Sequence, residues 1–387
     1  MVFEPDDETL RMLRQSIREF VLKDVEPIAS RIDNEDYFPE PIFRKMGRMG
    51  YLGITVPTEY GGSGMNIAAQ AIIEEELGYS SPSLALSYGA HSNLCLDNLY
   101  RNGSELIRRS FVPKLASGEW IGSLALTEPG SGSDALGMRS EAREDGDQII
   151  LNGSKTLITN APFSDLFLVY ARTGDSYSAF VVLSSDKGFS RGKKFNKMGM
   201  RGSPTGEIYF DNIVLGRERV VGEYGNGKDI ILSGLNSERV VLSFIFTGLA
   251  RRALETAIEY STQRKQFNTH LYRFELIEEK LAYMYIKYET SRLLVEKALH
   301  NLERDRMDSL SAAAAIMHST ESAEYISREA IQILGGLGYT KDMVVERLMR
   351  DSILGQIGAG TTEIRKHLIA SALVKSFKKD PKILGSV

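Results

Sequence analysis

The stretch with the most unusual chemistry in the sequence is GQIGAGTTE, residues 355–363, which directly precedes a segment with helical patterning. Three glycines and Ala359 stand within six residues. Glycine leaves the backbone open to close approach because it has no side chain. The loop therefore predicts a site where a ligand contacts the backbone, and it raises the question of which side chain does the chemistry there.

A second candidate site is LALTEPGSGSD, residues 124–134, which begins as a strand and ends as a loop. Gly130 and Gly132 leave backbone amides uncovered, and Thr127, Ser131 and Ser133 add hydroxyl donors. Such a loop suits a pyrophosphate or the edge of a flavin ring. Taken alone, the same residues also fit a polar β-turn without a ligand.

Other motifs are incomplete. The segment GEYGNGKD, residues 222–229, resembles a phosphate-binding loop but has Asp229 where a Ser or Thr would bind magnesium, so a glycine turn between domains is expected. No G-x-G-x-x-G follows a strand and opens a helix. The five histidines show no metal-ligand spacing, and we expect no metal site.

Composition narrows the class of protein. A net charge of −4 carries no basic excess of the kind that nucleic-acid binding requires. No uninterrupted apolar run approaches the ~18 residues that span a bilayer. The single cysteine, Cys95, fits a reducing compartment, and the acidic N-terminus lacks the features of a signal peptide. We expect a soluble cytoplasmic protein, or one of the mitochondrial matrix if a transit peptide has been removed.

The periodicity of apolar residues divides the chain into three parts. Residues 1–119 repeat their apolar positions at helical spacing, and residues 120–222 form short β-branched or aromatic runs between turn residues. Residues 223–387 return to helical spacing in four long stretches, 229–266, 274–303, 308–334 and 361–378. The prediction is a mainly α protein with an N-terminal helical domain, a middle β-barrel or β-sheet domain and a C-terminal four-helix bundle.

Six motifs in order resemble the acyl-CoA dehydrogenase family over nearly the whole chain. They are LTEPGSGSD, NGSKTLITN (152–160), KMGMRGS (197–203), RKQF (264–267), QILGGLGY (332–339) and RDSILGQIGAGTTEI (350–364), and SYGAHSNLC (87–95) is closest to the isovaleryl-CoA branch. The resemblance implies the same three domains, tightly bound FAD and a homotetramer built from dimers. It also implies an acyl-CoA substrate and an electron-transferring flavoprotein as acceptor.

The family reaction removes a proton from the α carbon and a hydride from the β carbon of an acyl-CoA, and the hydride goes to FAD. Most members place the catalytic glutamate at the position that is Ala359 here. The backbone N–H of Ala359 survives that change and could bind the thioester carbonyl. The proton acceptor must come from elsewhere.

The best candidate for the base is Glu238, because the isovaleryl-CoA and long-chain branches carry their glutamate on this helix, before an arginine. The residues that follow it are unusually apolar, and burial would raise the pKa of a carboxylate there. The alternative is a glutamate on the helix surface beside Arg239.

Two further positions bear on the substrate and the flavin. Gly358 stands where many straight-chain members have tyrosine, so either its missing ring makes room for a branched acyl group or glycine meets a backbone requirement. Leu157 replaces a tryptophan that usually lies beside the flavin.

The resemblance also assigns the remaining site residues. The expected FAD contacts are Leu124, Leu126, Thr127, Gly132, Ser133, Ile158, Thr159, Thr361 and Glu363, with Arg264, Gln332, Gly335 and Gly336 reaching the FAD of a neighbouring subunit. The expected acyl-CoA contacts are Ser133, Ser190, Arg191, Arg239, Gly358 and Gly360.

The first function predicted is FAD-dependent α,β-dehydrogenation of a short or branched-chain acyl-CoA. The alternatives are a dehydrogenase of longer straight chains, a flavin oxidase or monooxygenase, and a flavin-binding relative that no longer dehydrogenates.

Overall fold

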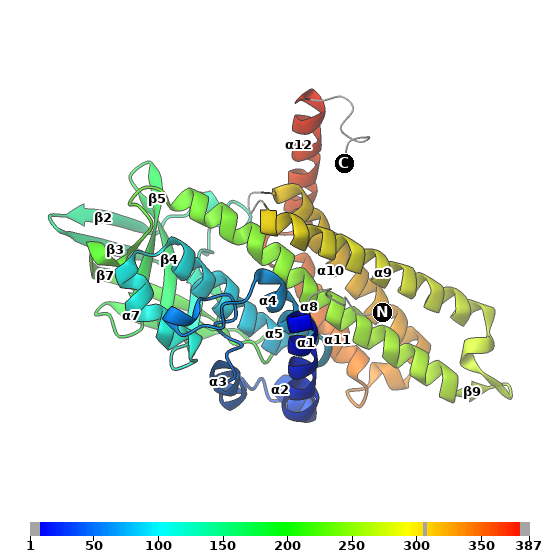
Figure 1. Ribbon diagram of the computed structural model, residues 1–387. Helices are drawn as coiled ribbons and strands as arrows, with labels where there is room; N and C mark the ends of the chain where they lie inside the picture. The colour runs from blue at the N-terminus through cyan, green and yellow to red at the C-terminus, as the bar shows by residue number, and fades with distance from the viewer. Residues whose placement is uncertain (1–7, 305–307, 380–387) are drawn as a thin grey trace.

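The computed structural model describes residues 8–304 and 308–379 and shows three parts in chain order (Figure 1). The first part is helical, and its longest helix, α4, is buried on almost every side because it lies between the other N-terminal helices and the C-terminal domain. Its helices are α1 (Glu8–Phe20), α2 (Ala29–Asn34), α3 (Glu40–Arg48), α4 (Ile67–Ser80), α5 (Pro82–Gly89), α6 (Asn98–Asn102) and α7 (Glu105–Ala116).

The second part is an open sheet with the strand order β6-β7-β3-β2-β4-β5-β8, and β1 pairs in parallel with β4. Alternate residues of β4 face opposite sides: Phe167 belongs to the core of the β domain, whereas Leu168 packs with α7. The strands are β1 (Gly122–Ala125), β2 (Glu141–Asp145), β3 (Gln148–Thr159), β4 (Leu166–Thr173), β5 (Ser176–Leu183), β6 (Phe189–Lys194), β7 (Thr205–Gly216) and β8 (Val220–Val221).

The third part is built around the long helix α8, which packs against α4, α9 and α10. A short hairpin of β9 (Lys265–Gln266) and β10 (Thr269–His270) joins α8 to α9. The helices are α8 (Gly227–Gln263), α9 (Glu275–Arg304), α10 (Ser309–Leu334), α11 (Val344–Ile353) and α12 (Thr362–Lys379).

Helix α8 is long and apolar enough to span a membrane by length and composition, but 78% of its most apolar window is buried within the fold. This is how the core helix of a globular domain looks. The predicted order of helical, β and helical parts is confirmed, and the middle domain is a sheet that does not close into a barrel.

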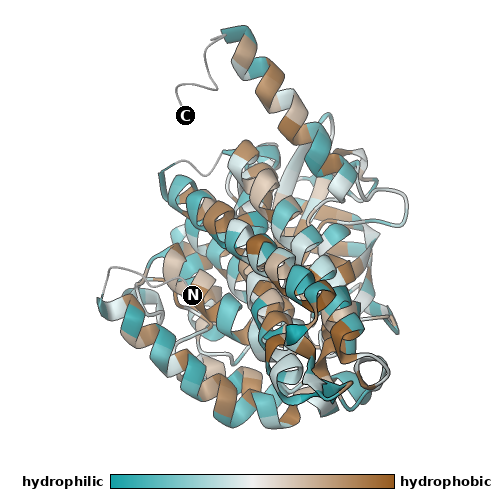
Figure 2. Ribbon diagram, turned by 90° about the vertical axis from the view of Figure 1, so that its right-hand side faces the viewer, coloured by the Kyte–Doolittle hydropathy of each residue, from teal (hydrophilic) through white to brown (hydrophobic). Residues whose placement is uncertain are grey.

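Two outer helices of the C-terminal part expose apolar side chains. Figure 2 shows apolar residues along the outward helices of this part, and Figure 1 shows α12 extending away from the body of the molecule. The exposed large apolar residues of these two helices are Leu276, Tyr283, Tyr285, Ile286, Leu293 and Leu294 on α9, and Leu373, Val374 and Phe377 on α12. Exposed apolar residues that gather into a patch are typical of an interaction surface.

Candidate active site

Glu238 lies on α8 in a partly buried position next to the loop that contains Ala359. Within the described residues, its carboxylate makes no hydrogen bond or ion pair in the structure. Burial raises the pKa of Glu238 from 4.5 to about 7, and the positive charges of Arg239 and Arg365 oppose the rise. A carboxylic acid with such a pKa can exchange a proton at neutral pH.

Two arginines hold the loop beside Glu238. The Nε of buried Arg239 donates to the carbonyl oxygen of Ala359 at 3.1 Å. The guanidinium of Arg365 is fully buried and donates to the carbonyl oxygens of Gly355, at 2.7 Å, and of Gly358. Bonds from charged donors are stronger than neutral ones, so the loop is held in a defined conformation.

The bond from Arg365 to Gly358 orients the backbone N–H of Ala359. The carbonyl of Gly358 and the N–H of Ala359 belong to one planar trans peptide, so they point in opposite directions. The N–H of Ala359 makes no hydrogen bond within the described part of the chain, although its position is fixed by the arginine. It is therefore a free and preoriented donor.

The glycines of the loop differ in what they require. Gly360 has φ +90°, a left-handed conformation in which a side chain is strained, and Ala359 before it has φ +55°. Gly358 has no positive φ, and an added Cβ would lie 3.5 Å from the carbonyl oxygen of Leu354, an ordinary contact. The backbone therefore does not require glycine at position 358. The main effect of this glycine is the open volume left by the missing side chain.

The two segments predicted to contact the flavin lie side by side. The N–H of Thr156 donates to the carbonyl of Thr127 at 2.9 Å, and the hydroxyl of Ser123 donates to the carbonyl of Thr159 at 2.7 Å. Leu126 and Ile158 are buried, and Leu124, Thr127 and Thr159 are partly buried. The structure thus brings the ends of β1 and β3 together.

The loop after β1 has room for a cofactor. Gly132 and Ser133 are exposed, and a Cβ added at Gly130 or Gly132 would meet nothing within 4 Å. Leu157 lies at a bulge of β3 and has φ +57°. Its side chain is exposed, at 57% of its surface. Open backbone and hydroxyl donors beside an exposed apolar side chain fit a flavin, whose ring is apolar and whose phosphates need donors.

Sequence reasoning missed the ion pair that braces this loop. The ammonium of Lys155 is fully buried and bonds to Glu128 Oε1 at 2.8 Å and to the carbonyl of Leu126 at 3.0 Å. The carboxylate of Glu128 also accepts from the backbone N–H groups of Arg139 and Ser140. The sequence did contain a signal for this ion pair, namely a lysine within a segment patterned as a strand. A lysine that is buried in a strand needs a carboxylate partner.

Four of the predicted FAD residues lie far from these segments in the same chain. Arg264 follows the last residue of α8, roughly 40 Å along the helix from Glu238 at a rise of ~1.5 Å per residue. Figure 1 places the β9–β10 hairpin at the opposite end of the molecule from the sheet. Gln332, Gly335 and Gly336 are exposed at the C-terminal end of α10. These residues do not reach the loop after β1 within one subunit.

The other predicted residues are exposed or half-exposed around the site. Ser190 and Arg191 lie on β6, and the guanidinium of Arg191 donates to the carbonyls of Ala161 and Ser164. Thr361 accepts from the N–H of Ile364 at the start of α12, and Glu363 is exposed.

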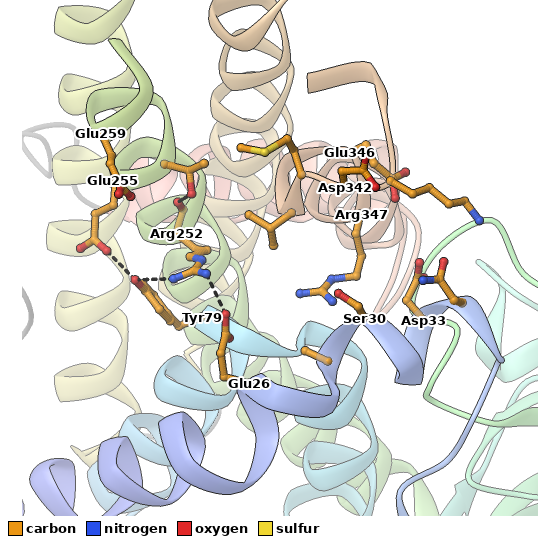
Figure 3. A pocket seen from close by; sticks show the side chains of 16 residues that line it. Glu26, Ser30, Asp33, Tyr79, Arg252, Glu255, Glu259, Asp342, Glu346 and Arg347 are labelled. Atoms are coloured by element: carbon orange, nitrogen blue, oxygen red, sulfur yellow. Dashed lines mark hydrogen bonds and ion pairs between the residues drawn. The ribbon is translucent and has the colours of Figure 1, made fainter. Parts of the chain in front are cut away.

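A cleft of about 360 Å³ lies elsewhere, between α2, α8 and the start of α11 (Figure 3). Its polar groups are largely engaged with one another: Arg252 bonds to Glu26 and Tyr79, and the hydroxyl of Tyr79 donates to Glu255. None of the predicted site residues lines it. We therefore assign no part of the reaction to this cleft.

Comparison with known proteins agrees with this arrangement. The acyl-CoA dehydrogenase N-terminal, middle and C-terminal domain models match residues 7–119, 123–213 and 225–374. A mitochondrial isovaleryl-CoA dehydrogenase of Oryza sativa subsp. japonica is 38% identical over 95% of this chain and 92% of its own.

Solved structures agree too. A glutaryl-CoA dehydrogenase in complex with glutaryl-CoA has a TM-score of 0.93 and 34% identity over 97% of both chains. An acyl-CoA dehydrogenase of Bacillus anthracis complexed with FAD has a TM-score of 0.91 and 31% identity over 98% of this chain and 68% of its own. The chain belongs to the acyl-CoA dehydrogenase family, whose members are FAD-dependent.

Proposed function

We propose that the protein catalyses the α,β-dehydrogenation of a short or branched-chain acyl-CoA to the 2-enoyl-CoA, with Glu238 as the proton acceptor. One observation carries the proposal. A carboxylate with a pKa of about 7 lies beside a loop whose usual glutamate position is Ala359, so the chain keeps one base next to the site although the loop has none.

Proton transfer is the task of Glu238. At neutral pH about half of its side chains are ionised, because the pKa of Glu238 lies near 7. The ionised form takes the α proton of the thioester, and burial makes it a stronger base than a solvated carboxylate. FAD, when bound, accepts the hydride that leaves the β carbon.

The N–H of Ala359 donates a hydrogen bond to the thioester oxygen, on which negative charge develops as the α proton leaves. A donor that is already oriented stabilises such charge without reorganisation. Arg365 supplies the orientation through the carbonyl of Gly358, and Arg239 holds the next carbonyl along the chain. The two arginines are therefore positioning residues for the oxyanion donor.

The acyl group lies beside Gly358 in this proposal. The open volume there suits branching near the reacting carbons. This reading is supported by the isovaleryl-CoA dehydrogenase relative, whose name states a short branched substrate. Ser133, Ser190, Arg191 and Gly360 would contact other parts of the acyl-CoA.

FAD would be held by the segments at 124–133 and 158–159, with Thr361 and Glu363 nearby. Arg264, Gln332, Gly335 and Gly336 are too remote to join them, which supports the prediction that they reach the FAD of a neighbouring subunit. The exposed apolar faces of α9 and α12 support assembly as a homotetramer. An electron-transferring flavoprotein would be the acceptor, in the cytoplasm or the mitochondrial matrix.

The test is product formation. The purified protein is incubated with straight and branched acyl-CoAs of four to eight carbons and an artificial electron acceptor, and products are identified by mass. We expect loss of two hydrogens, fastest for short or branched chains. Turnover that needs only oxygen and forms hydrogen peroxide would instead identify an oxidase, and absence of product with every substrate would refute the proposal.

A further inference from the structure

Glu74 is a buried glutamate that the proposed mechanism does not use. It stands first in a run of three glutamates on α4. The next two, Glu75 and Glu76, form ion pairs with Arg14 and Arg251. Successive helix residues point about 100° apart, and Glu74 faces away from those arginines. It exposes only 1% of its surface, and neither carboxylate oxygen has a hydrogen-bond partner among the described residues.

Two other buried side chains share this environment. Gln70 lies one turn before Glu74 on the same face of α4, and its Oε1 accepts from Asn93 Nδ2 at 3.0 Å. Gln70 Nε2 and Asn93 Oδ1 are both buried and have no partner within the part of the chain that the structure describes. We call Gln70, Glu74 and Asn93 the Glu74 cluster. Unpartnered buried polar atoms are rare, so several in one place call for an explanation.

The Glu74 cluster adjoins the proposed base. Asn93 Nδ2 also donates to the hydroxyl of Ser237 at 3.1 Å, and Ser237 directly precedes Glu238 on α8. Burial raises the pKa of Glu74 well above its ordinary value, and the charge of Glu238 adds to the rise. Asn93 lies in a π-helical stretch, Ala90–Asp97, and such stretches are frequent at functional sites.

The backbone makes room for the carboxylate. Gly89, the last residue of α5, has φ −60°, a conformation that any residue adopts. A Cβ added there would lie 2.6 Å from Glu74 Oε1. Glycine at this position therefore serves to accommodate the side chain of Glu74 rather than a special backbone conformation.

On the basis of the proposed function, we propose that the Glu74 cluster forms the far end of the acyl-binding site and selects acyl groups that end in a neutral hydroxyl or carboxamide group. A hydroxyl or an amide both donates and accepts hydrogen bonds. It can therefore accept from Gln70 Nε2, donate to Asn93 Oδ1 and bond to the carboxyl of Glu74, satisfying donors and acceptors together.

Charged ends fit less well. No lysine or arginine among the described residues bonds to the Glu74 cluster, so a terminal carboxylate would be buried without a cation. A terminal ammonium could pair with Glu74 only in its ionised form, which burial disfavours, and it would also meet the N–H donors of Gln70. A methyl end that reaches the cluster would leave its unpartnered atoms unpaired, so it should react more slowly than a polar end of the same length, whereas an acyl group too short to reach the cluster would not be affected.

The test compares acyl-CoAs with the same number of heavy atoms. The pairs are 4-hydroxybutanoyl with pentanoyl, 5-hydroxypentanoyl with hexanoyl, and 4-carbamoylbutanoyl with 5-methylhexanoyl, with glutaryl as the charged comparison. For each pair, the readout is the ratio of the second-order rate constants of anaerobic flavin reduction at low acyl-CoA concentration. We expect a preference of at least about tenfold for the polar member of one pair or more in the native protein.

Three variants keep the test independent of folding. Glu74→Leu removes the polar end and should abolish or invert the preference, whereas Glu74→Gln retains donors and acceptors and should keep part of it. Gln70→Met, on the same helix face, should reduce the same ratio. The ratio is the readout, because a merely structural role would change both members of a pair equally.

The outcomes separate the two proposals. If apolar acyl-CoAs reduce the flavin but no pair differs by more than about twofold, or if Glu74→Leu leaves the ratio unchanged, the selective role of the Glu74 cluster is wrong and the dehydrogenase stands. If no acyl-CoA reduces the flavin, the dehydrogenase proposal is wrong and this inference falls with it.

Discussion

Replacing Glu238 by glutamine should stabilise the protein at pH 8 and change its stability little at pH 5. The folded state raises the pKa of Glu238 from 4.5 to about 7. A carboxyl group whose folded pKa is raised contributes stability below the unfolded pKa, and this contribution is lost as pH rises through the folded pKa. The native protein therefore loses stability between about pH 4.5 and 7, and a glutamine, which does not titrate, avoids that loss.

The magnitude follows from the size of the rise. At about 1.4 kcal/mol for each tenfold change in the ionisation constant, the full effect is roughly 3 kcal/mol. Glu238 is only partly buried, and water screens part of the cost, so we expect about 1–2 kcal/mol at pH 8. For a chain of this size that corresponds to a higher Tm by roughly 1–3 °C.

The assay is thermal unfolding of the FAD-loaded protein at pH 5 and pH 8. The matched control is Glu259→Gln, the same change at an exposed position of the same helix, which should show no such pH-dependent gain. If Glu238→Gln shifts Tm equally at both pH values, or lowers Tm at pH 8, then Glu238 is not held in a desolvating site and the reasoning is refuted.

Three further predictions concern the reaction and its supports. The rate of flavin reduction at low acyl-CoA concentration should rise with pH to a plateau above about pH 7, because only ionised Glu238 accepts a proton; a flat profile in stopped-flow measurements between pH 5.5 and 8.5 would contradict this. Lys155→Met should lower the free energy of unfolding by about 3–5 kcal/mol and weaken FAD retention, because it leaves Glu128 buried without its cation. The double variant Lys155→Met with Glu128→Leu should recover most of the stability, and unfolding curves and flavin fluorescence would measure both effects. Gly358→Ala should fold normally but slow branched substrates more than straight ones, whereas Gly360→Ala should lower Tm because its φ of +90° strains a side chain; equal effects on Tm would count against the distinction between the two glycines.

The order of helical and β domains could be predicted from the sequence because each domain has its own period of apolar residues. The predicted helix at 308–334 is found as α10, Ser309–Leu334, and the one at 274–303 as α9, Glu275–Arg304. The first prediction for the sheet allowed a closed barrel. Periodicity shows which residues are strands but not whether the last strand returns to the first, and β6 and β8 remain at opposite edges.

The site was only partly predictable. Motifs led to the prediction of Glu238 and of the loop around Ala359, but the exposure of Glu238 depends on the rotation of α8, which packing alone decides. The roles of Arg365 and Lys155 come from bonds to carbonyl oxygens 7 and 29 residues away along the chain, and no motif spacing encodes these bonds. Glu74 is one of three consecutive glutamates, and its isolation follows from where Arg14 and Arg251 lie.

The most direct test of Glu238 as the proton acceptor is anaerobic flavin reduction by isovaleryl-CoA and other short acyl-CoAs, comparing the native protein with Glu238→Gln. We expect the native flavin to lose its yellow absorbance within the mixing time or soon after. The variant should bind FAD normally but be reduced at least about a thousandfold more slowly, because the glutamine cannot accept the α proton. Reduction of the variant at the native rate would show that another group takes the proton and would contradict the assignment of Glu238.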